Sequence, residues 1–413
     1  MPTSRNSRRS YASRGVDRTE DPRLLSALFI AFLILSINLG ASEYVSFQCA
    51  TWGFLLLVVL RPATWRRSEI YGIVGAAFFA LAHILVFVLR KDTSLGHWAL
   101  SMARDAIGVF MLFWVKNNTS PSLRSLSIAA LTVAVVIAMV WAGLQLLSSK
   151  FLGQQILTIP QSAYALKYGT LASGLAESGM ELTKIRPSGP FSEPSALAVL
   201  GTCGLLVGLL KHKRKLTLCS IVLIAIAQSV NGFVAAIVCV AYVGIRSRRK
   251  ALFILLIAMA VALGVAVESK RLDAIQKGSD DSANVRIIYP FSMIRKAMPA
   301  GISYDEGKVQ AQQSFGTSSV FDNWNMKELV TMGAAAFPVF ILLFLMFREG
   351  EGYWVLLFLV ANFNGALFYY DRIVLLFFAF AALSNPKRVA SIKRHALSRR
   401  MHPQQIPAEG LNR

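Results

Sequence analysis

The residues best suited to chemistry lie in an eleven-residue stretch that begins with Arg186 and ends at Ala196. Three prolines and Gly189 fall within it. Because proline lacks an amide hydrogen and fixes its φ angle, the stretch predicts a defined bend rather than a regular helix. A guanidinium at Arg186 can bind a phosphate through two parallel hydrogen bonds, and a carboxylate at Glu193 can accept a proton. A plainer interpretation stays open, because Pro/Gly/Ser clusters also mark ordinary loops before membrane helices.

Further arginines flank the long apolar runs of the chain. Arg286 sits among apolar residues in a segment that could lie at a membrane surface, and Arg295 follows it. Arg372 stands at the boundary between two apolar runs. Because the planar guanidinium matches phosphate geometry, Arg186, Arg286, Arg295 and Arg372 are candidate ligands of a lipid-linked phosphate or diphosphate. The alternative is that these side chains reach toward lipid headgroups.

Proton transfer and metal binding have few candidates in the large polar segments. No histidine occurs between His97 and His212, and the adjacent acidic pairs lack the several further oxygens that a hard metal ion needs. Chemistry without a metal or cofactor is therefore expected. Glu193 is the first candidate for a catalytic base, and Asp322 is the alternative. A carboxylate at a helix N-terminus is stabilised in its charged form, so Glu193 could equally cap the next helix or pair with Arg186.

The composition indicates an all-α, polytopic integral membrane protein. Of 413 residues, 55% are hydrophobic and only 16% are charged, which lies outside the range of soluble domains. The net charge of +21 is expected to mark cytoplasmic loops, where Lys and Arg collect. No soluble basic domain is visible, so nucleic-acid binding is not expected. The four cysteines lie inside apolar runs and are expected to be core residues.

Alternation of basic loops predicts the organisation of the chain. A cytoplasmic basic arm (1–23) precedes a polytopic membrane domain (24–385), and a cytoplasmic basic tail (386–413) follows it. About 12 transmembrane helices, with both termini inside, place every short basic loop in the cytoplasm and leave two large extracytoplasmic loops. Those loops are 148–194 and 268–328. The expected spans are 24–41, 45–60, 70–89, 97–115, 126–147, 195–210, 251–267, 329–347, 353–370 and 373–384, together with two short helices within 216–245 that meet at Asn231-Gly232.

Three polar residues are expected inside the membrane runs. His83 falls in the third span, and Arg104 and Asp105 fall in the middle of the fourth. Intramembrane charges are functional candidates by default, although structural hydrogen bonding is the favoured interpretation here. Neighbouring residues on a helix point about 100° apart. Arg104 and Asp105 are therefore expected to pair with other helices rather than with each other.

The combination of these features resembles a known family. Many apolar spans, the motif Arg-x-Ser-Gly-x-Phe-x-Glu-Pro-Ser at 186–195, and Arg286 followed fifteen residues later by Gly301 resemble the Wzy-type repeat-unit polymerases of O-antigen and exopolysaccharide. That family shares a superfamily with the O-antigen ligases. The Asn231-Gly232-Phe233 sequence is similar to a polar break of the family within paired short helices. The resemblance covers residues 120–385.

One position departs from the family pattern. In the ligases and many polymerases a histidine stands eleven positions before a glycine that begins the span after the second loop. Here the glycine is Gly333 and the matching position is Asp322. This departure disfavours the ligase interpretation and leaves the identity of the catalytic base open between Glu193 and Asp322.

The resemblance implies a GT-C-like membrane glycosyltransferase of the bacterial inner membrane. It would join undecaprenyl-diphosphate-linked oligosaccharide repeat units at the outer face, by inverting and metal-independent transfer. A flippase and a chain-length regulator of the same pathway are the expected protein partners, besides membrane lipid. Two other hypotheses are a glycan ligase and a lipid-linked-sugar transporter or flippase. A transporter is disfavoured because the chain shows no internal repeat with matching broken helices.

Overall fold

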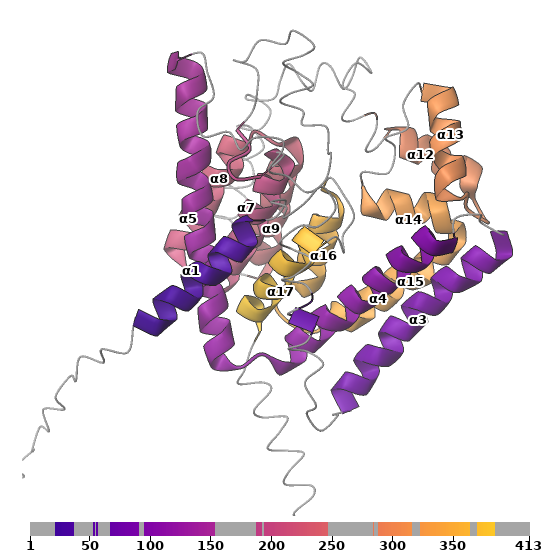
Figure 1. Cartoon of the computed structure of the whole chain (residues 1–413), viewed down its shortest axis with the longest axis horizontal. Coiled ribbons are helices and arrows are strands. Elements are labelled where there is room, and N and C mark those ends of the chain that lie inside the picture. Colours follow the sequence, from indigo (N-terminus) through magenta and orange to yellow (C-terminus); the bar gives the residue numbers. More distant parts are fainter. Residues whose placement is uncertain are drawn as a thin grey trace, which may run out of the picture.

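A computed structural model of the chain describes residues 21–36, 53, 55–56, 67–90, 95–152, 187–191, 194–246, 284, 288–315, 323–363 and 370–384. Within these ranges the protein is all-α, as predicted, and contains no strand. The predicted spans 45–60 and 251–267, most of loop 148–194 and the two terminal segments lie largely outside the described residues. The described helices, shown in Figure 1, are α1 (Asp21–Leu35), α3 (Arg67–Arg90), α4 (Leu95–Asn118), α5 (Pro121–Leu152), α7 (Pro194–Leu210), α8 (Arg214–Ala227), α9 (Val230–Arg246), α12 (Tyr289–Ala297), α13 (Tyr304–Phe315), α14 (Trp324–Met332), α15 (Ala336–Phe347), α16 (Tyr353–Ala361) and α17 (Tyr370–Leu383).

Three helical stretches are long and apolar enough to cross a membrane: Ile70–Val88, Pro121–Leu152 and Trp324–Phe347. Four shorter apolar helices accompany them, at Leu24–Leu35, Pro194–Leu210, Val230–Arg246 and Arg372–Leu383. Large apolar side chains are exposed along α1, α3 and α5, where lipid tails would cover them. Long apolar helices with exposed apolar side chains are typical of a membrane protein, as the composition predicts.

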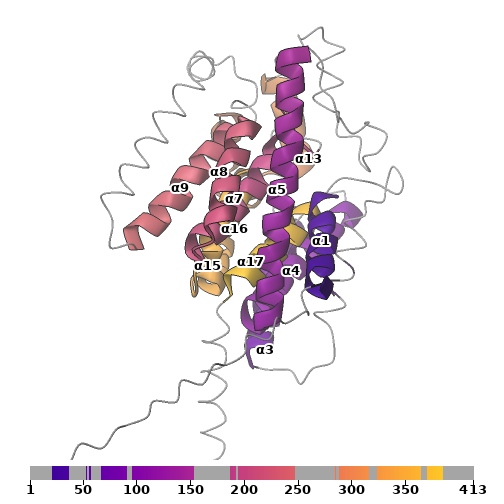
Figure 2. The ribbon, with the colours of Figure 1, turned by 90° about the vertical axis from the view of Figure 1, so that its left-hand side faces the viewer.

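Helix α7 lies at the centre of the helix bundle. It is apolar on every side, and nearly all of its residues are buried. The neighbours of α7 are α5, α8, α9, α16 and α17. Three glycines on one side of α7 (Gly201, Gly204 and Gly208) face α8, and a β-carbon at Gly208 would lie 2.8 Å from the Thr217 amide nitrogen. Small residues at this spacing let two helices approach closely. The long helix α5 stands beside α1, α8 and α17 (Figure 2).

The predicted pair of short helices within 216–245 is present as α8 and α9, but the break is a few residues earlier than expected. Gln228 adopts the left-handed conformation at φ 47° and ψ 44°, which ends α8. Helix α9 begins at Val230, so Asn231 and Gly232 lie in its first turn. Gly232 is needed for packing rather than for the turn, because a β-carbon there would lie 3.0 Å from the Ala198 Cβ of α7.

Helices α12, α13 and α14 form a small cluster at the end of the second predicted loop (Figure 1). Met293, Ala297, Ala311 and Val330 make its apolar core, and the Tyr289 and Phe315 rings stack with their centroids 4.0 Å apart.

The span that follows this cluster begins earlier than predicted. The span was expected to start at residue 329, whereas α14 begins at Trp324 and continues through Gly333–Ala335 into α15. The start of α14 is amphipathic. Trp324 is 1% exposed and packs in the core, although the polar residues beside it indicated a loop.

Candidate functional site

The six predicted site residues fall into two groups. Arg186, Glu193, Arg286 and Asp322 lie outside the described residues, so their roles stay predictions. Arg295 and Arg372 are described. The residues next to the first group are described in part, and they show how the structure builds the surroundings of the predicted site.

The bend predicted after Arg186 is present at Pro187–Phe191 and is attached to α5 by one side chain. Gln145 Oε1 accepts hydrogen bonds from the amides of Ser188 (3.2 Å) and Gly189 (2.8 Å), and its Nε2 donates to the Gly189 carbonyl (3.3 Å). Gly189 has φ +62°, the left-handed region that favours glycine, and Phe191 is fully buried. The chain that directly follows Arg186 is therefore held in one conformation against the bundle.

The start of α7, just after this bend, lies beside the start of α9. Leu197 Cδ1 packs 3.2 Å from the position of a β-carbon at Gly189, and Ala198 meets Gly232 in the first turn of α9. From that same turn, Asn231 Nδ2 donates to the backbone carbonyl of Asn362 at 3.3 Å. Asn362 ends α16. The bend, α7, α9 and α16 thus meet at one end of the bundle.

A third asparagine extends this contact to α14. Asn323 Nδ2 donates to Asn362 Oδ1 at 3.0 Å, while Asn323 Oδ1 accepts from the Met326 amide and caps α14. Asn323 is 5% exposed. We call Asn231, Asn323 and Asn362 the asparagine junction. It joins three helix ends that are far apart in sequence.

The asparagine junction connects the surroundings of the two candidate bases. Glu193 directly precedes Pro194, the first residue of α7, and Asp322 directly precedes Asn323. Sequence reasoning marked Asn231 but missed Asn323 and Asn362. The available signal was weak: Asn362 interrupts an otherwise apolar run, and Asn323 stands where a helix cap is common.

The two described arginines have contrasting environments. Arg372, in the first turn of α17, is 6% exposed, so it does not reach out to headgroups as the alternative interpretation assumed. Arg295 is exposed in the last turn of α12, within the cluster of α12 to α14. Burial of a charged arginine is costly unless another group or a ligand compensates the charge. Arg372 is therefore the stronger of the two candidates for diphosphate binding.

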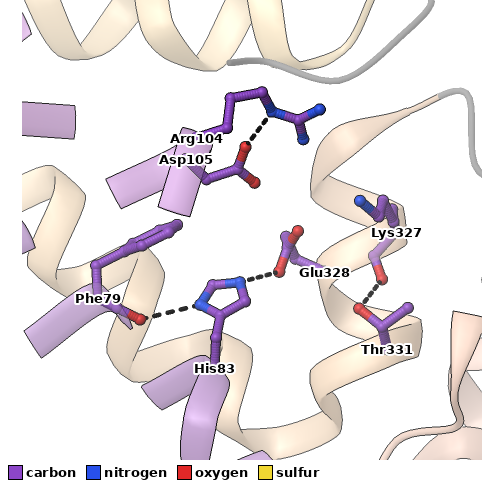
Figure 3. Close-up of polar contacts among 7 residues, drawn as sticks. All are labelled: Phe79, His83, Arg104, Asp105, Lys327, Glu328 and Thr331. Atoms are coloured by element: carbon purple, nitrogen blue, oxygen red, sulfur yellow. Dashed lines mark hydrogen bonds and ion pairs between the residues drawn. The ribbon is translucent and has the colours of Figure 1, made fainter. Parts of the chain in front are cut away.

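A second polar cluster lies between α3, α4 and α14 (Figure 3). His83 Nε2 lies 3.2 Å from Glu328 Oε2, and His83 Nδ1 lies 2.9 Å from the Phe79 carbonyl oxygen. Arg104 Nε donates to Asp105 Oδ1 at 2.9 Å. We call His83, Arg104, Asp105 and Glu328 the His83 cluster.

Two expectations about the His83 cluster need correction. Arg104 and Asp105 were expected to pair with other helices, but they pair with each other, because the long arginine side chain can fold back over the 100° between neighbouring positions. Glu328 was assigned to the second loop, whereas it is buried in α14. His83 on α3 does bond to another helix, through Glu328 on α14, and the choice between a structural and a functional role for it stays a prediction.

The chemistry open to the asparagine junction follows from its amides. Amide groups donate and accept hydrogen bonds, so they suit sugar hydroxyls, but they cannot take up a proton at neutral pH. A base would have to come from residues beside the junction. Among the residues that the structure describes, no group of three or more His, Cys, Asp or Glu side chains is placed to hold a metal ion.

Comparison with known proteins found no matching family model, no similar curated protein and no similar solved structure. The family resemblance in the sequence motifs therefore stays an expectation, and the function is argued below as a proposal.

Proposed function

We propose that this membrane protein polymerises undecaprenyl-diphosphate-linked oligosaccharide repeat units into exopolysaccharide or O-antigen at the outer face of the bacterial inner membrane. The reaction would be an inverting glycosyl transfer without metal or cofactor. A sugar hydroxyl of one lipid-linked unit attacks the anomeric carbon of the other chain, the bond from that carbon to the diphosphate breaks, and a base takes the hydroxyl proton.

The observation that carries the proposal is the attachment of the Pro187–Phe191 bend to Gln145. The bend is the described part of the motif that resembles the polymerases. Three hydrogen bonds and the buried side chain of Phe191 stabilise it. Such rigidity is expected where the flanking residues, Arg186 and Glu193, must be positioned for catalysis.

The asparagine junction gives the proposal further support. It holds the start of α14, next to Asp322, close to the start of α9, which packs on α7. Under the proposal, the junction binds sugar hydroxyls, and one of Glu193 and Asp322 accepts the proton. Arg186, Arg286 and Arg372 stabilise the charge that develops on the leaving diphosphate. Arg295, being exposed, assists at the edge of this site.

Energy estimates indicate how the work would be divided. One charge pair at contact contributes roughly 4 kcal/mol at an effective dielectric constant near 20. Enzymes lower barriers by about 8–23 kcal/mol. Alignment of two bound reactants can supply about 7–11 kcal/mol. Two or three arginines are therefore insufficient alone, and a rigid site for two membrane-anchored substrates is the larger contribution.

The topology is part of the proposal. We propose about 12 spans with both termini in the cytoplasm and with the loops 148–194 and 268–328 outside, from the distribution of short basic loops. Cysteines introduced at Ser173 and Ser279 should react with a membrane-impermeant thiol reagent in intact spheroplasts. If they react only after lysis, the reaction site is on the wrong side of the membrane for this function.

The function is tested in a strain that lacks the gene for this chain. Wild-type protein should restore a polymer ladder on electrophoresis, and the deletion should accumulate single lipid-linked units that face outward. Arg186→Lys and Arg286→Lys should lose the ladder almost as completely as the alanine variants, because a point charge cannot reproduce bidentate geometry. The exposed Lys213→Ala serves as the control and should leave the ladder intact.

Other outcomes would contradict the proposal in distinct ways. Accumulation of finished lipid-linked polymer would indicate a ligase, and single units retained on the cytoplasmic leaflet would indicate a flippase. A ladder of normal length in both Arg→Lys variants, at equal protein amount, would remove the arginines from the reaction.

A further inference from the structure

The His83 cluster contains ionisable groups that the proposed function does not use. The side chains of Glu328 and Asp105 are each 3% exposed, and those of His83 and Arg104 are 12% and 13% exposed. The four residues come from α3, α4 and α14, and their polar atoms point toward one another in Figure 3. Charged groups removed from water in this way must be compensated by one another.

The hydrogen-bond partners of His83 determine where its protons lie. The Phe79 carbonyl can only accept a hydrogen bond, so Nδ1, 2.9 Å away, carries a hydrogen. On the other side, Nε2 faces a carboxylate oxygen of Glu328 at 3.2 Å. Two lone pairs would repel at this distance. A proton must therefore lie between Nε2 and Oε2, carried either by the imidazole ring or by the carboxyl group.

We infer that His83 and Glu328 share one proton, and that the His83 cluster is an electrically neutral proton-binding site between α3, α4 and α14. If the ring holds the proton, the charges of Arg104, Asp105, His83 and Glu328 cancel in two pairs. If the carboxyl group holds it, His83 and Glu328 are both neutral and the Arg104–Asp105 pair still cancels. Removal of the proton would leave these four residues with one net negative charge in a buried position, which is unfavourable.

One further charge lies close to this site. Lys327 precedes Glu328 on α14, and its ammonium acts on that carboxylate. A positive charge there favours the arrangement with the proton on the ring. It does not remove the need for a proton between Nε2 and Oε2. The inference does not depend on the proposed function, since it rests on the hydrogen-bond geometry alone.

Nuclear magnetic resonance of the ¹⁵N-histidine-labelled protein in lipid nanodiscs tests the inference directly. The chain has five histidines, and the His83→Gln variant assigns the His83 signals by difference. We expect both His83 nitrogen signals to stay unchanged between pH 5 and 8, while an exposed histidine titrates at about pH 6.5. A His83 signal that titrates with the others, or that lacks the hydrogen on Nδ1, would overturn the inference.

A set of charge variants gives an independent test by melting temperature in detergent at pH 7. Glu328→Gln should have a small effect, because the glutamine amide can donate to neutral His83 and the remaining charges cancel. Asp105→Asn should lower the melting temperature by several degrees, because it leaves Arg104 uncompensated. The Arg104→Gln/Asp105→Asn double variant should regain most of that loss. The exposed Glu306→Gln on α13 is the matched control and should show no shift.

A cluster without a shared proton predicts a different order. Glu328→Gln and Asp105→Asn would then each remove one negative charge, so the two variants should shift the melting temperature alike, whatever Lys327 contributes. Either that result or failure of the double variant to recover would contradict the neutral cluster. If Asp105→Asn does not fold, the pH titration of the His83 signals in the wild-type protein still tests the inference.

Discussion

Gln145 holds the backbone of Gly189 from both sides, through its Oε1 to the amide at 2.8 Å and its Nε2 to the carbonyl at 3.3 Å. The two residues are 44 positions apart in the chain. An amide side chain carries a donor and an acceptor on neighbouring atoms, so Gln145 can bond the amide and the carbonyl of one residue at once. Gln145 is 1% exposed, so water does not reach the Gly189 backbone to take over these hydrogen bonds.

Gln145→Leu should release the bend. It leaves the buried amide and carbonyl of Gly189 unsatisfied, which costs about 1–3 kcal/mol of stability. Under the proposed function, polymerisation should fall further than stability, because Arg186 and Glu193 flank the bend. Melting temperature and polymer length are the measurements. Ser149→Ala is the control, since the Ser149 hydroxyl donates to the Leu146 carbonyl of the same helix, and it should be nearly neutral.

Asn362 and Asn323 should act as a coupled pair. Asn362→Ala leaves the buried Nδ2 of Asn323 without its acceptor, which costs about 1–3 kcal/mol. Together with Asn323→Ala, a double-mutant cycle should give a coupling energy of about 0.5–3 kcal/mol. Additive effects of the two substitutions would show that the side chains of Asn323 and Asn362 are not coupled energetically. Asn117→Ala, which removes a bond within α4 only, is the comparison.

Gly333→Ala should destabilise the connection between α12 and α15. Gly333 has φ +57° and ψ −132°, a conformation open almost only to glycine. A β-carbon would lie 2.5 Å from the Gly301 amide nitrogen, and the neighbouring Ala334 amide bonds to the Pro299 carbonyl at 2.8 Å. We expect the free energy of unfolding, measured by heat or denaturant, to fall by about 1–3 kcal/mol or more.

Gly143→Ala is the matched control for this variant. Gly143 lies within α5, and the nearest atom to an added β-carbon is 3.9 Å away. Alanine there should stabilise the helix by about 0.5–1 kcal/mol. Equal effects of the two substitutions would contradict the conformational argument for Gly333.

Lys211 should contribute a pH dependence to stability. Burial lowers the pKa of its ammonium, although the hydrogen bond to Glu351 opposes this effect. Between the lowered folded pKa and the ordinary value of about 10.4, the unfolded state binds more protons. Stability contributed by this group therefore rises with pH across that window. Melting temperature against alkaline pH should rise less, or fall more, in Lys211→Met than in wild type.

Lys213→Met is the control for Lys211, since Lys213 is exposed and two residues away. Its pH profile should follow that of the wild type. An unchanged profile in Lys211→Met would show that burial of the ammonium does not affect its titration.

The sequence by itself determined the class of the fold and several of its local features. The lengths of the apolar runs predict membrane helices because a bilayer requires a set length of apolar helix. Proline and glycine predict the bend at Pro187–Phe191 because they restrict or free the backbone at their own positions. Basic flanks predict the paired short helices α8 and α9. These signals are all local in the chain, which is why they could be read without a structure.

Only the tertiary structure decided which distant side chains meet. Gln145 with Gly189, Asn323 with Asn362, and His83 with Glu328, which are 245 positions apart, carry no mutual signal in a single sequence. The physical reason is that the apolar faces of membrane helices are chemically alike. Hydrophobicity therefore predicts that the helices pack, but not which helices become neighbours. The small residues of α7 and the polar contacts at the helix ends select those neighbours. Glu328 shows the consequence, because it was assigned to a loop, whereas Trp324 and Glu328 are both buried in α14.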